Sequence, residues 1–192
     1  MPDPAPAALT FLQTRRSRPA KTLGQPVPDR AALRPLLEVA LRCPDHGKLE
    51  PWRLIVLDRA ALDRLAGLVP ECGARLGKAP GDIAKQSAQF ADAGLAVAVI
   101  SSPVESEKIP AIEQAYSAAC VAYGLLTAAL AAGWGANWLS GWASHDAAFA
   151  RDGLGLAAHE AITGFVHIGT ETATPPERPR PDIDARTTWM TA

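Results

Sequence analysis

The feature that most constrains the fold is the most apolar stretch of the chain, residues 116–142. It is rich in alanine and is broken by Gly133 and Gly135. A helix that crosses a bilayer needs about 20 consecutive apolar residues, so this interrupted stretch predicts a buried helix followed by a strand. We expect the helix over 109–132 and the strand over 135–140. The many small side chains allow neighbouring elements to approach closely, which suits a core or a dimer interface.

Strands and helices alternate irregularly around this helix. The run LAVAVIS, residues 95–101, predicts a fully buried strand because it is apolar throughout. Hydrophobic periodicity and capping residues predict further strands over 52–57 and 161–170. They predict helices over 4–14, 29–42 with Asp29 as its cap, 59–68, a stretch after Pro70, 81–91, and a short helix capped by Ser144. This order lacks the spacing of a doubly wound parallel sheet and favours an α+β layer fold.

Composition and charge exclude several classes of protein. The chain has 192 residues, which suits one domain over 1–192, with a Pro-rich polar arm over 171–192. It carries 19 basic and 20 acidic residues, whereas a nucleic-acid binder normally has a basic excess. No GxGxxG follows a predicted strand and no GxxxxGK[ST] occurs, so a Rossmann or P-loop site is not expected.

The cysteines indicate a reducing compartment. The chain has an odd number of cysteines, namely Cys43, Cys72 and Cys120, and they form no CxxC motif and no Cys/His metal spacing. We therefore expect a cytoplasmic protein with free thiols. The first residues lack the basic and apolar regions of a secretion signal. Cys120 is expected on the buried face of the long helix.

The first candidate site is Arg15-Arg16-Ser17, at the end of the first predicted helix. Two guanidinium groups and a hydroxyl can hold a phosphate through charge-assisted hydrogen bonds. The alternative is structural, because basic residues commonly end a helix and offset its dipole. The cluster alone does not decide between the two.

The second candidate is the loop 43–52, which gathers Cys43, Asp45, His46 and a lysine between two prolines. A Cys–His catalytic pair is conceivable, but no nearby third residue orients the imidazole. A metal site built on Asp45 and His46 lacks further ligands at a recognisable spacing. The alternative is a plain connection from helix to strand.

The third candidate is the segment 133–142, GWGANWLSGW. Its glycines let backbone amides approach a flat ligand, and its tryptophans could wall such a pocket. The alternative is a tightly packed turn and strand with the tryptophans in the core. His145, His159 and His167 are isolated, and we expect them to be structural or on the surface.

Taken together, these patches resemble the nitroreductase superfamily, in particular its minimal bacterial YdjA-like branch. That family begins with a helix ending in Arg-Arg-Ser, here 15–17, and continues with Arg-x-Pro-Asp-His, here 42–46. A Gln-Pro-Trp follows, with Glu replacing Gln in 50–52. Later motifs are Trp-x-Ser-Gly, here 138–141, and Gly-Phe-x-x-x-Gly-Thr, here 164–170. Four motifs in the right order make the resemblance specific.

The resemblance implies an α+β fold with a mostly antiparallel sheet flanked by helices, in an interlocked homodimer that exchanges C-terminal arms. It implies FMN at the subunit interface, with Pro44, Asp45 and His46 supplied by the second subunit. Two arm arginines would reach the FMN phosphate. The residues implied to contact FMN are Arg15, Arg16, Ser17, Arg42, Pro44, Asp45, His46, Trp138, Leu139, Ser140, Gly141, Arg178 and Arg180.

By the same resemblance, the chain would be an NAD(P)H oxidoreductase that reduces nitroaromatic, quinone or similar small acceptors in two-electron ping-pong turnovers. The flavin would carry the chemistry, with no covalent side-chain catalyst and no metal. Three alternatives stay open: a relative with different flavin chemistry (enone reduction, dehalogenation or flavin degradation), a flavin-binding or redox-sensing protein, and a dimeric interaction module without a cofactor. No residue is clearly placed to bind the 2′-phosphate that distinguishes NADPH from NADH, so both nucleotides are possible electron donors.

Overall fold

The strand β5 (Ala161–Glu171) organises the fold, because β1, β3 and β4 all pair with it antiparallel. The computed structural model describes residues 3–191, which form six α-helices and five strands. The remaining helices and strands are α1 (Pro6–Thr14), β1 (Leu23–Gly24), α2 (Arg30–Ala40), β2 (Trp52–Leu57), α3 (Arg59–Arg75), α4 (Pro80–Ala91), β3 (Ala96–Ser101), α5 (Ala111–Ala131), β4 (Gly135–Leu139) and α6 (Ala147–Leu154).

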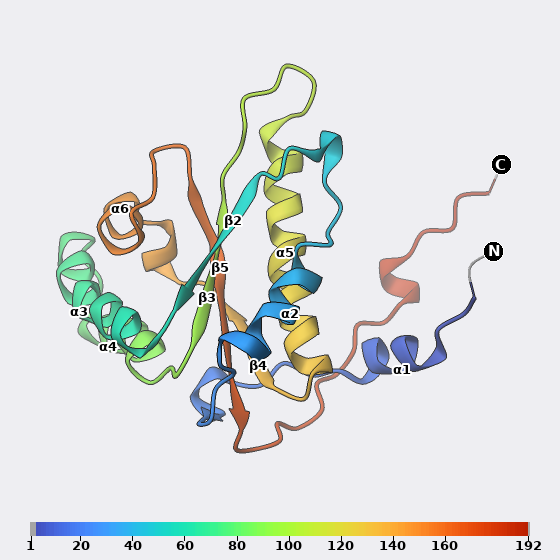
Figure 1. Cartoon of the computed structure of the whole chain (residues 1–192), viewed down its shortest axis with the longest axis horizontal. Coiled ribbons are helices and arrows are strands. Elements are labelled where there is room, and N and C mark those ends of the chain that lie inside the picture. The colour runs from blue at the N-terminus through green and yellow to red at the C-terminus, as the bar shows by residue number, and fades with distance from the viewer. Residues whose placement is uncertain (1–2, 192) are drawn as a thin grey trace.

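The sheet is the middle of three layers. Its strand order is β1-β5-β3-β2, with β4 also paired to β5. Helices α3, α4 and α6 cover one face, and α2 and α5 cover the other (Figure 1). Every residue of β3 is buried, because alternate side chains enter the two cores. A strand covered on both faces is apolar throughout, which explains the LAVAVIS run.

The two cores are packed differently. On the α3–α4–α6 face, three aromatic rings meet: Phe90 lies edge-on to Phe165 at 5.1 Å and is stacked with Phe149 at 5.7 Å between ring centroids. On the other face, α5 approaches α2 so closely that a Cβ at Gly124 would lie 3.3 Å from Ala40 Cα. The small residues of α5 thus permit close helix packing, as the sequence predicted.

Helix α5 is long and apolar enough by composition to cross a membrane, and half of its most apolar window is buried inside the fold. It packs on the sheet as a core helix. The prediction that Cys120 lies on its buried face is wrong, because that thiol is exposed. The buried face instead carries Ser117, Ala118, Val121 and Ala122. An almost uniformly apolar helix gives no periodicity that would reveal which face the sheet covers.

Two further details differ from the sequence prediction. Pro70 does not separate two helices, since α3 runs through it. A proline removes the hydrogen bond to the carbonyl four residues earlier, and here that carbonyl, on Ala66, accepts instead from the Ser87 hydroxyl at 3.1 Å. The cap of α6 is Asp146, whose carboxylate accepts from the Phe149 amide, while Ser144 accepts from the Gly141 amide.

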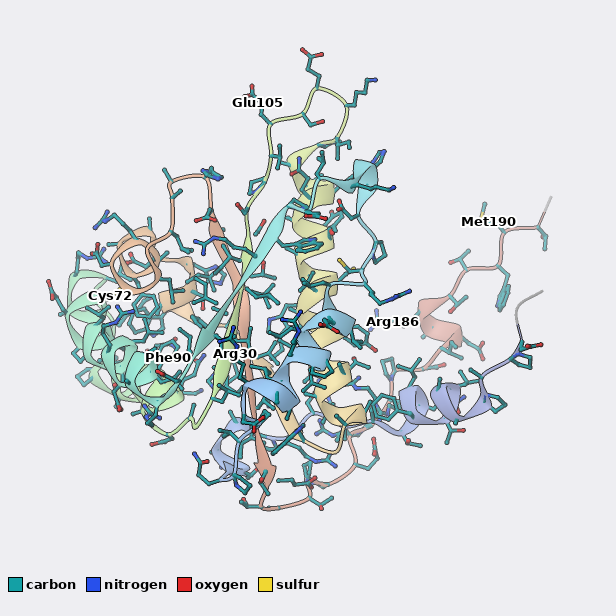
Figure 2. All side chains as sticks on the ribbon, viewed as in Figure 1. Arg30, Cys72, Phe90, Glu105, Arg186 and Met190 are labelled. Carbon is teal, nitrogen blue, oxygen red and sulfur yellow. The ribbon has the colours of Figure 1, made fainter. Side chains whose placement is uncertain are left out.

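The two ends of the chain lie outside these layers. Helix α1 buries none of its side chains. The arm after β5 extends along the same side of the molecule as α1 (Figure 1). Three of its apolar side chains are largely exposed, and the labelled Met190 stands well away from the sheet (Figure 2). These three are Ile183 at 73%, Trp189 at 82% and Met190 at 90%.

Candidate functional site

Residues 15–18 lie beside β4. The Arg18 amide donates to the Ala136 carbonyl at 2.9 Å, and the Asn137 side-chain amide donates to the Arg18 carbonyl at 2.5 Å. The segment is therefore held along the free edge of β4, which also carries Trp138 and Leu139. This contact brings two of the predicted motifs, Arg-Arg-Ser and Trp-x-Ser-Gly, next to each other.

The arginines of this segment border a cavity of about 310 Å³, which is completed by the end of α5, Trp134 and the start of the arm. Arg18 pairs with Glu171 at 2.7 Å, and this contact lowers the pKa of the Glu171 carboxyl. Arg15 donates to the Ser17 hydroxyl at 3.3 Å. Within residues 3–191, the buried Nε atoms of Arg15 and Arg16 have no hydrogen-bond partner. Unpartnered guanidinium donors beside a cavity suit an anionic group such as a phosphate.

A second, larger cavity of about 630 Å³ lies between α4 and the end of β4. It is lined by Ala20, Lys21, Asp82, Lys85, Gln86, Ala88, Gln89, Asp92, Ala93, Leu139, Ser140, Gly141, Trp142 and His167. Gly141 packs against Gln86 so closely that a Cβ would collide with the amide oxygen. The predicted residues 139–141 thus form part of a real cavity wall, and the glycine is required there by close packing.

The polar groups of this cavity are incompletely hydrogen-bonded by the protein. The Gln86 amide donates to Gln89 Oε1 at 2.9 Å. Among the described residues, Gln89 Nε2, Trp142 Nε1 and both ring nitrogens of His167 are buried without a partner. His167 is only 1% exposed, and this burial lowers its pKa to about 4. The imidazole is therefore neutral at pH 7, with one donor and one acceptor.

The loop 43–50 is held against the N-terminal half of α5 by polar contacts with that helix. His46 Nδ1 lies 2.7 Å from Glu113 Oε2, and the Ser117 hydroxyl donates to the Pro44 carbonyl at 2.7 Å. The Asp45 carboxylate accepts from two backbone amides of its own loop. Arg42 is exposed. The loop is thus ordered, with His46 presented on the surface.

The geometry argues against a Cys–His catalytic pair. Burial raises the pKa of the Cys43 thiol, and its sulfur lies 3.7 Å from the Ser117 hydroxyl. His46 contacts Glu113 instead. A protonated thiol that has no base beside it is a poor nucleophile. Within residues 3–191, no group of three or more His, Cys, Asp or Glu side chains forms a candidate metal site.

One chain does not bring all the predicted residues together. His46 lies near Glu113 at the start of α5, whereas Arg15 lies 5.6 Å from the ring of Tyr123, ten residues further along that helix. Ten residues of α-helix span about 15 Å. Arg180 on the arm pairs with Glu177 at 2.8 Å. Glu177 borders the arginine cavity.

Sequence reasoning missed the contribution of α4 and assigned His167 no binding role. Gln86 and Gln89 are one helical turn apart and so share a face of α4. Their polarity was visible, but nothing local indicates that this face meets the end of β4. Lys21 and Lys85 are exposed lysines whose place at the cavity depends on the same packing.

An antiparallel sheet between two helical layers defines an α+β protein, and its arginine cluster next to a larger mixed polar and apolar cavity suits a small anionic ligand. The sequence comparisons then identify its family. A sequence profile of the Nitroreductase family matches residues 12–170, and the chain belongs to that family and is an oxidoreductase.

Two relatives cover most of the chain. The chain is 31% identical over 163 residues to the Escherichia coli (strain K12) protein described as "Putative NAD(P)H nitroreductase YdjA", with 85% of this chain and 87% of the relative covered. It is 33% identical over 165 residues to a Haemophilus influenzae protein described as "Putative NAD(P)H nitroreductase", with 85% and 88% covered. The family resemblance is thereby confirmed.

Solved structures show the same fold. A nitroreductase-like family protein from Bacillus cereus superposes with a TM-score of 0.78 at 22% identity, covering 99% of this chain and 98% of that one. An FMN-dependent nitroreductase from Clostridium difficile R20291 gives 0.68 at 20% identity, covering 95% and 98%. The predicted α+β fold with a helix-flanked antiparallel sheet is confirmed.

Proposed function

We propose that this protein is an FMN-dependent NAD(P)H oxidoreductase that reduces nitroaromatic, quinone or similar small acceptors in two-electron ping-pong turnovers. Its E. coli and H. influenzae relatives are each described as a "Putative NAD(P)H nitroreductase", and its C. difficile structural neighbour as an FMN-dependent nitroreductase. The observation that carries the proposal is the 630 Å³ cavity beside residues 139–141, with an arginine cluster close by in the chain.

The larger cavity fits a flat, partly polar ring system. Its volume lies in the range of small-molecule sites, about 300–1,000 Å³. Leu139 and Trp142 supply apolar wall, while Gln86 and Gln89 supply amide groups. A side chain at position 141 would collide with Gln86, so the backbone is bare at this point of the cavity wall, where a flat ring could approach it.

The smaller cavity fits the phosphate of the same ligand. Arg15 and Arg16 offer buried, unpartnered Nε–H donors there. Arg16 is only four residues before Ala20, which lines the larger cavity. Four residues span at most about 14 Å of extended chain, so a single short segment joins the two subsites. We propose that Ser17 completes the phosphate site and that Arg178 and Arg180 of an arm also reach it.

A bound flavin would supply the hydride-accepting and hydride-donating chemistry. The protein residues then have to bind, orient and tune the ring. Lys21 and Lys85 line the cavity together with Asp82 and Asp92, so Arg15 and Arg16 of the neighbouring cavity are the main source of positive charge that would stabilise negative charge on a bound group. The neutral Cys43 thiol takes no part.

We also propose a homodimer with one flavin site at each end of a shared interface. A stripe of apolar side chains on α5 is exposed in the single chain: Ile112 at 55%, Tyr116 at 62% and Tyr123 at 46%. The spacing of these residues places them on one side of the helix. The loop carrying Arg42, Pro44, Asp45 and His46 is attached to the same helix. A two-fold axis through α5 would bring that loop to the partner's arginine cluster.

The rest of the assembly follows from the ends of the chain. Helix α1 and the described part of the arm carry exposed apolar side chains: Leu9, Leu12, Ile183, Trp189 and Met190. We propose one domain over 1–192 whose arm packs on the partner subunit. Three free cysteines support a cytoplasmic location.

Two measurements test this function. Denaturing the purified protein and chromatographing the released ligand is expected to give FMN, about one per chain, with no FAD. Anaerobic titration with NADH and with NADPH is expected to bleach the flavin absorbance, and an acceptor screen then identifies the oxidant. Protein that remains free of flavin after growth with riboflavin contradicts the proposal. Flavin that binds but is not reduced by either nucleotide indicates a binding or sensing role instead.

A further inference from the structure

Within residues 3–191, the buried imidazole of His167 has no hydrogen-bond partner, although it lies in the middle of the sheet. It stands on β5 opposite Asn137 of β4 and Ala96 of β3. It is 1% exposed, and neither ring nitrogen is hydrogen-bonded within the described residues. A buried polar group without a partner destabilises the fold, so an apolar residue would be more stable at this position.

The imidazole is not isolated from the rest of the molecule, because it forms part of the wall of the 630 Å³ cavity. Two further groups on that wall, Gln89 Nε2 and Trp142 Nε1, are also buried without partners among the described residues. Gln89 has its oxygen occupied by Gln86, which leaves its N–H groups available. Three residues with unpartnered polar groups, one each from α4, β5 and the turn after β4, therefore border one cavity, and buried polar groups without partners beside a cavity are typical of a binding site.

We propose that His167 is a cofactor-binding residue, whose imidazole hydrogen-bonds to the polar edge of the flavin ring in this cavity. The inference rests on the function proposed above and goes beyond it by assigning a ligand on β5. A neutral imidazole offers one donor and one acceptor. The edge of an isoalloxazine ring presents carbonyl oxygens, ring nitrogens and an N–H, so either nitrogen of His167 has a complementary atom.

The alternative is that His167 only fills space in the sheet. The two roles predict opposite effects of an apolar substitution. If His167 only fills space, His167→Leu removes an unpartnered polar group and leaves flavin binding unchanged. If His167 binds the flavin, the same change stabilises or spares the apoprotein and weakens the holoprotein.

The test compares His167→Leu with His159→Leu, a matched change at an exposed histidine. Apoprotein is prepared, FMN is titrated by fluorescence quenching, and the absorption spectrum and midpoint potential of the bound flavin are recorded. For His167→Leu we expect FMN affinity to fall about threefold to tenfold, which is the worth of one hydrogen bond, with a shifted flavin spectrum. His159→Leu should match the wild type. Wild-type affinity and an unchanged spectrum in His167→Leu would overturn the inference.

A second measurement needs no substitution and decides the matter if His167→Leu fails to fold. The ring nitrogens of ¹⁵N-histidine-labelled protein are observed by NMR, with and without FMN. One His167 nitrogen is expected to shift when FMN binds, as its hydrogen bonding changes. Unchanged His167 signals in protein saturated with FMN would refute the contact. Failure of the wild-type protein to bind any flavin would instead reject the proposed function itself.

Discussion

The two faces of the sheet differ in how completely they are covered. On the α3–α4–α6 face, the core around Phe90, Phe149 and Phe165 is closed, and each of these rings is at most 2% exposed. On the other face, α5 covers the sheet but turns Ile112, Tyr116 and Tyr123 outward. The α5 face thus carries an exposed apolar stripe, which is the surface that the proposed dimer would cover. Substitutions on the two faces should therefore affect different quantities.

The largest effect is expected on the closed face. Phe90→Ala removes a fully buried ring that contacts two others, and such changes typically cost about 3–5 kcal/mol. Urea unfolding followed by circular dichroism should show this loss at every protein concentration. A loss that vanished at high concentration would mean that association, and not this core, provides the stability.

On the face covered by α2 and α5, Tyr116→Glu should weaken the proposed dimer and leave the fold intact. Placing a charge where an aromatic side chain packs against a partner weakens association on the order of 100-fold. Sedimentation velocity across a concentration series measures this effect. Val56→Glu is the control, because Val56 is also an exposed apolar residue, at 46%, but lies on β2. Equal behaviour of the two variants would contradict an interface on α5.

A smaller effect on stability is expected at Asp146, which belongs to the closed face. Its carboxylate caps α6, pairs with Arg75 at 2.6 Å and accepts from the Cys72 thiol. These contacts, chiefly the one with Arg75, lower the pKa of Asp146 to about 2, while burial raises that of Cys72 to about 11. A lowered carboxyl pKa contributes stability that is fully present above about pH 4 and is lost as the pH falls toward 2.

Asp146→Asn keeps a capping residue and removes the charge. We expect a loss of about 2 kcal/mol at pH 7 and a flatter stability profile between pH 4 and pH 2. Unfolding curves at several pH values provide the measurement. Asp152→Asn is the control on the same helix, because its pair with Arg151 is exposed and such pairs contribute little. If the stability of Asp146→Asn fell between pH 4 and pH 2 as steeply as that of the wild type, the loss of stability in acid could not be attributed to Asp146.

The finest test asks whether each flavin site uses both chains. Arg16→Glu and His46→Glu should each bind FMN poorly as homodimers. If each site uses Arg16 of one chain and His46 of the other, a mixed dimer of the two variants has both substitutions in one site and neither in the second site. About half of the wild-type flavin and activity should then return. A mixed dimer as empty as its parents would show that Arg16 and His46 do not serve a shared site.

The local sequence was sufficient for the elements that depend on short-range patterns. The LAVAVIS run predicted β3, Asp29 predicted the start of α2, and the alanine-rich stretch predicted α5 and β4. Ordered motifs predicted the family. These features follow from neighbouring residues, through periodicity, capping and composition, so they could be recognised without knowing how the elements pack.

Only the tertiary structure decided which surfaces meet. The exposure of Cys120 depends on which side of α5 rests on the sheet, and the Ala66 carbonyl, which Pro70 leaves without its helical donor in α3, accepts from a hydroxyl of α4. The cavity formed by Gln86, Gln89 and His167 exists because α4 packs beside the end of β4. Such contacts join residues far apart in the chain, and their energies appear only after the backbone has brought them together. For that reason the sequence determined the elements and the family, and the packing of the elements decided the site.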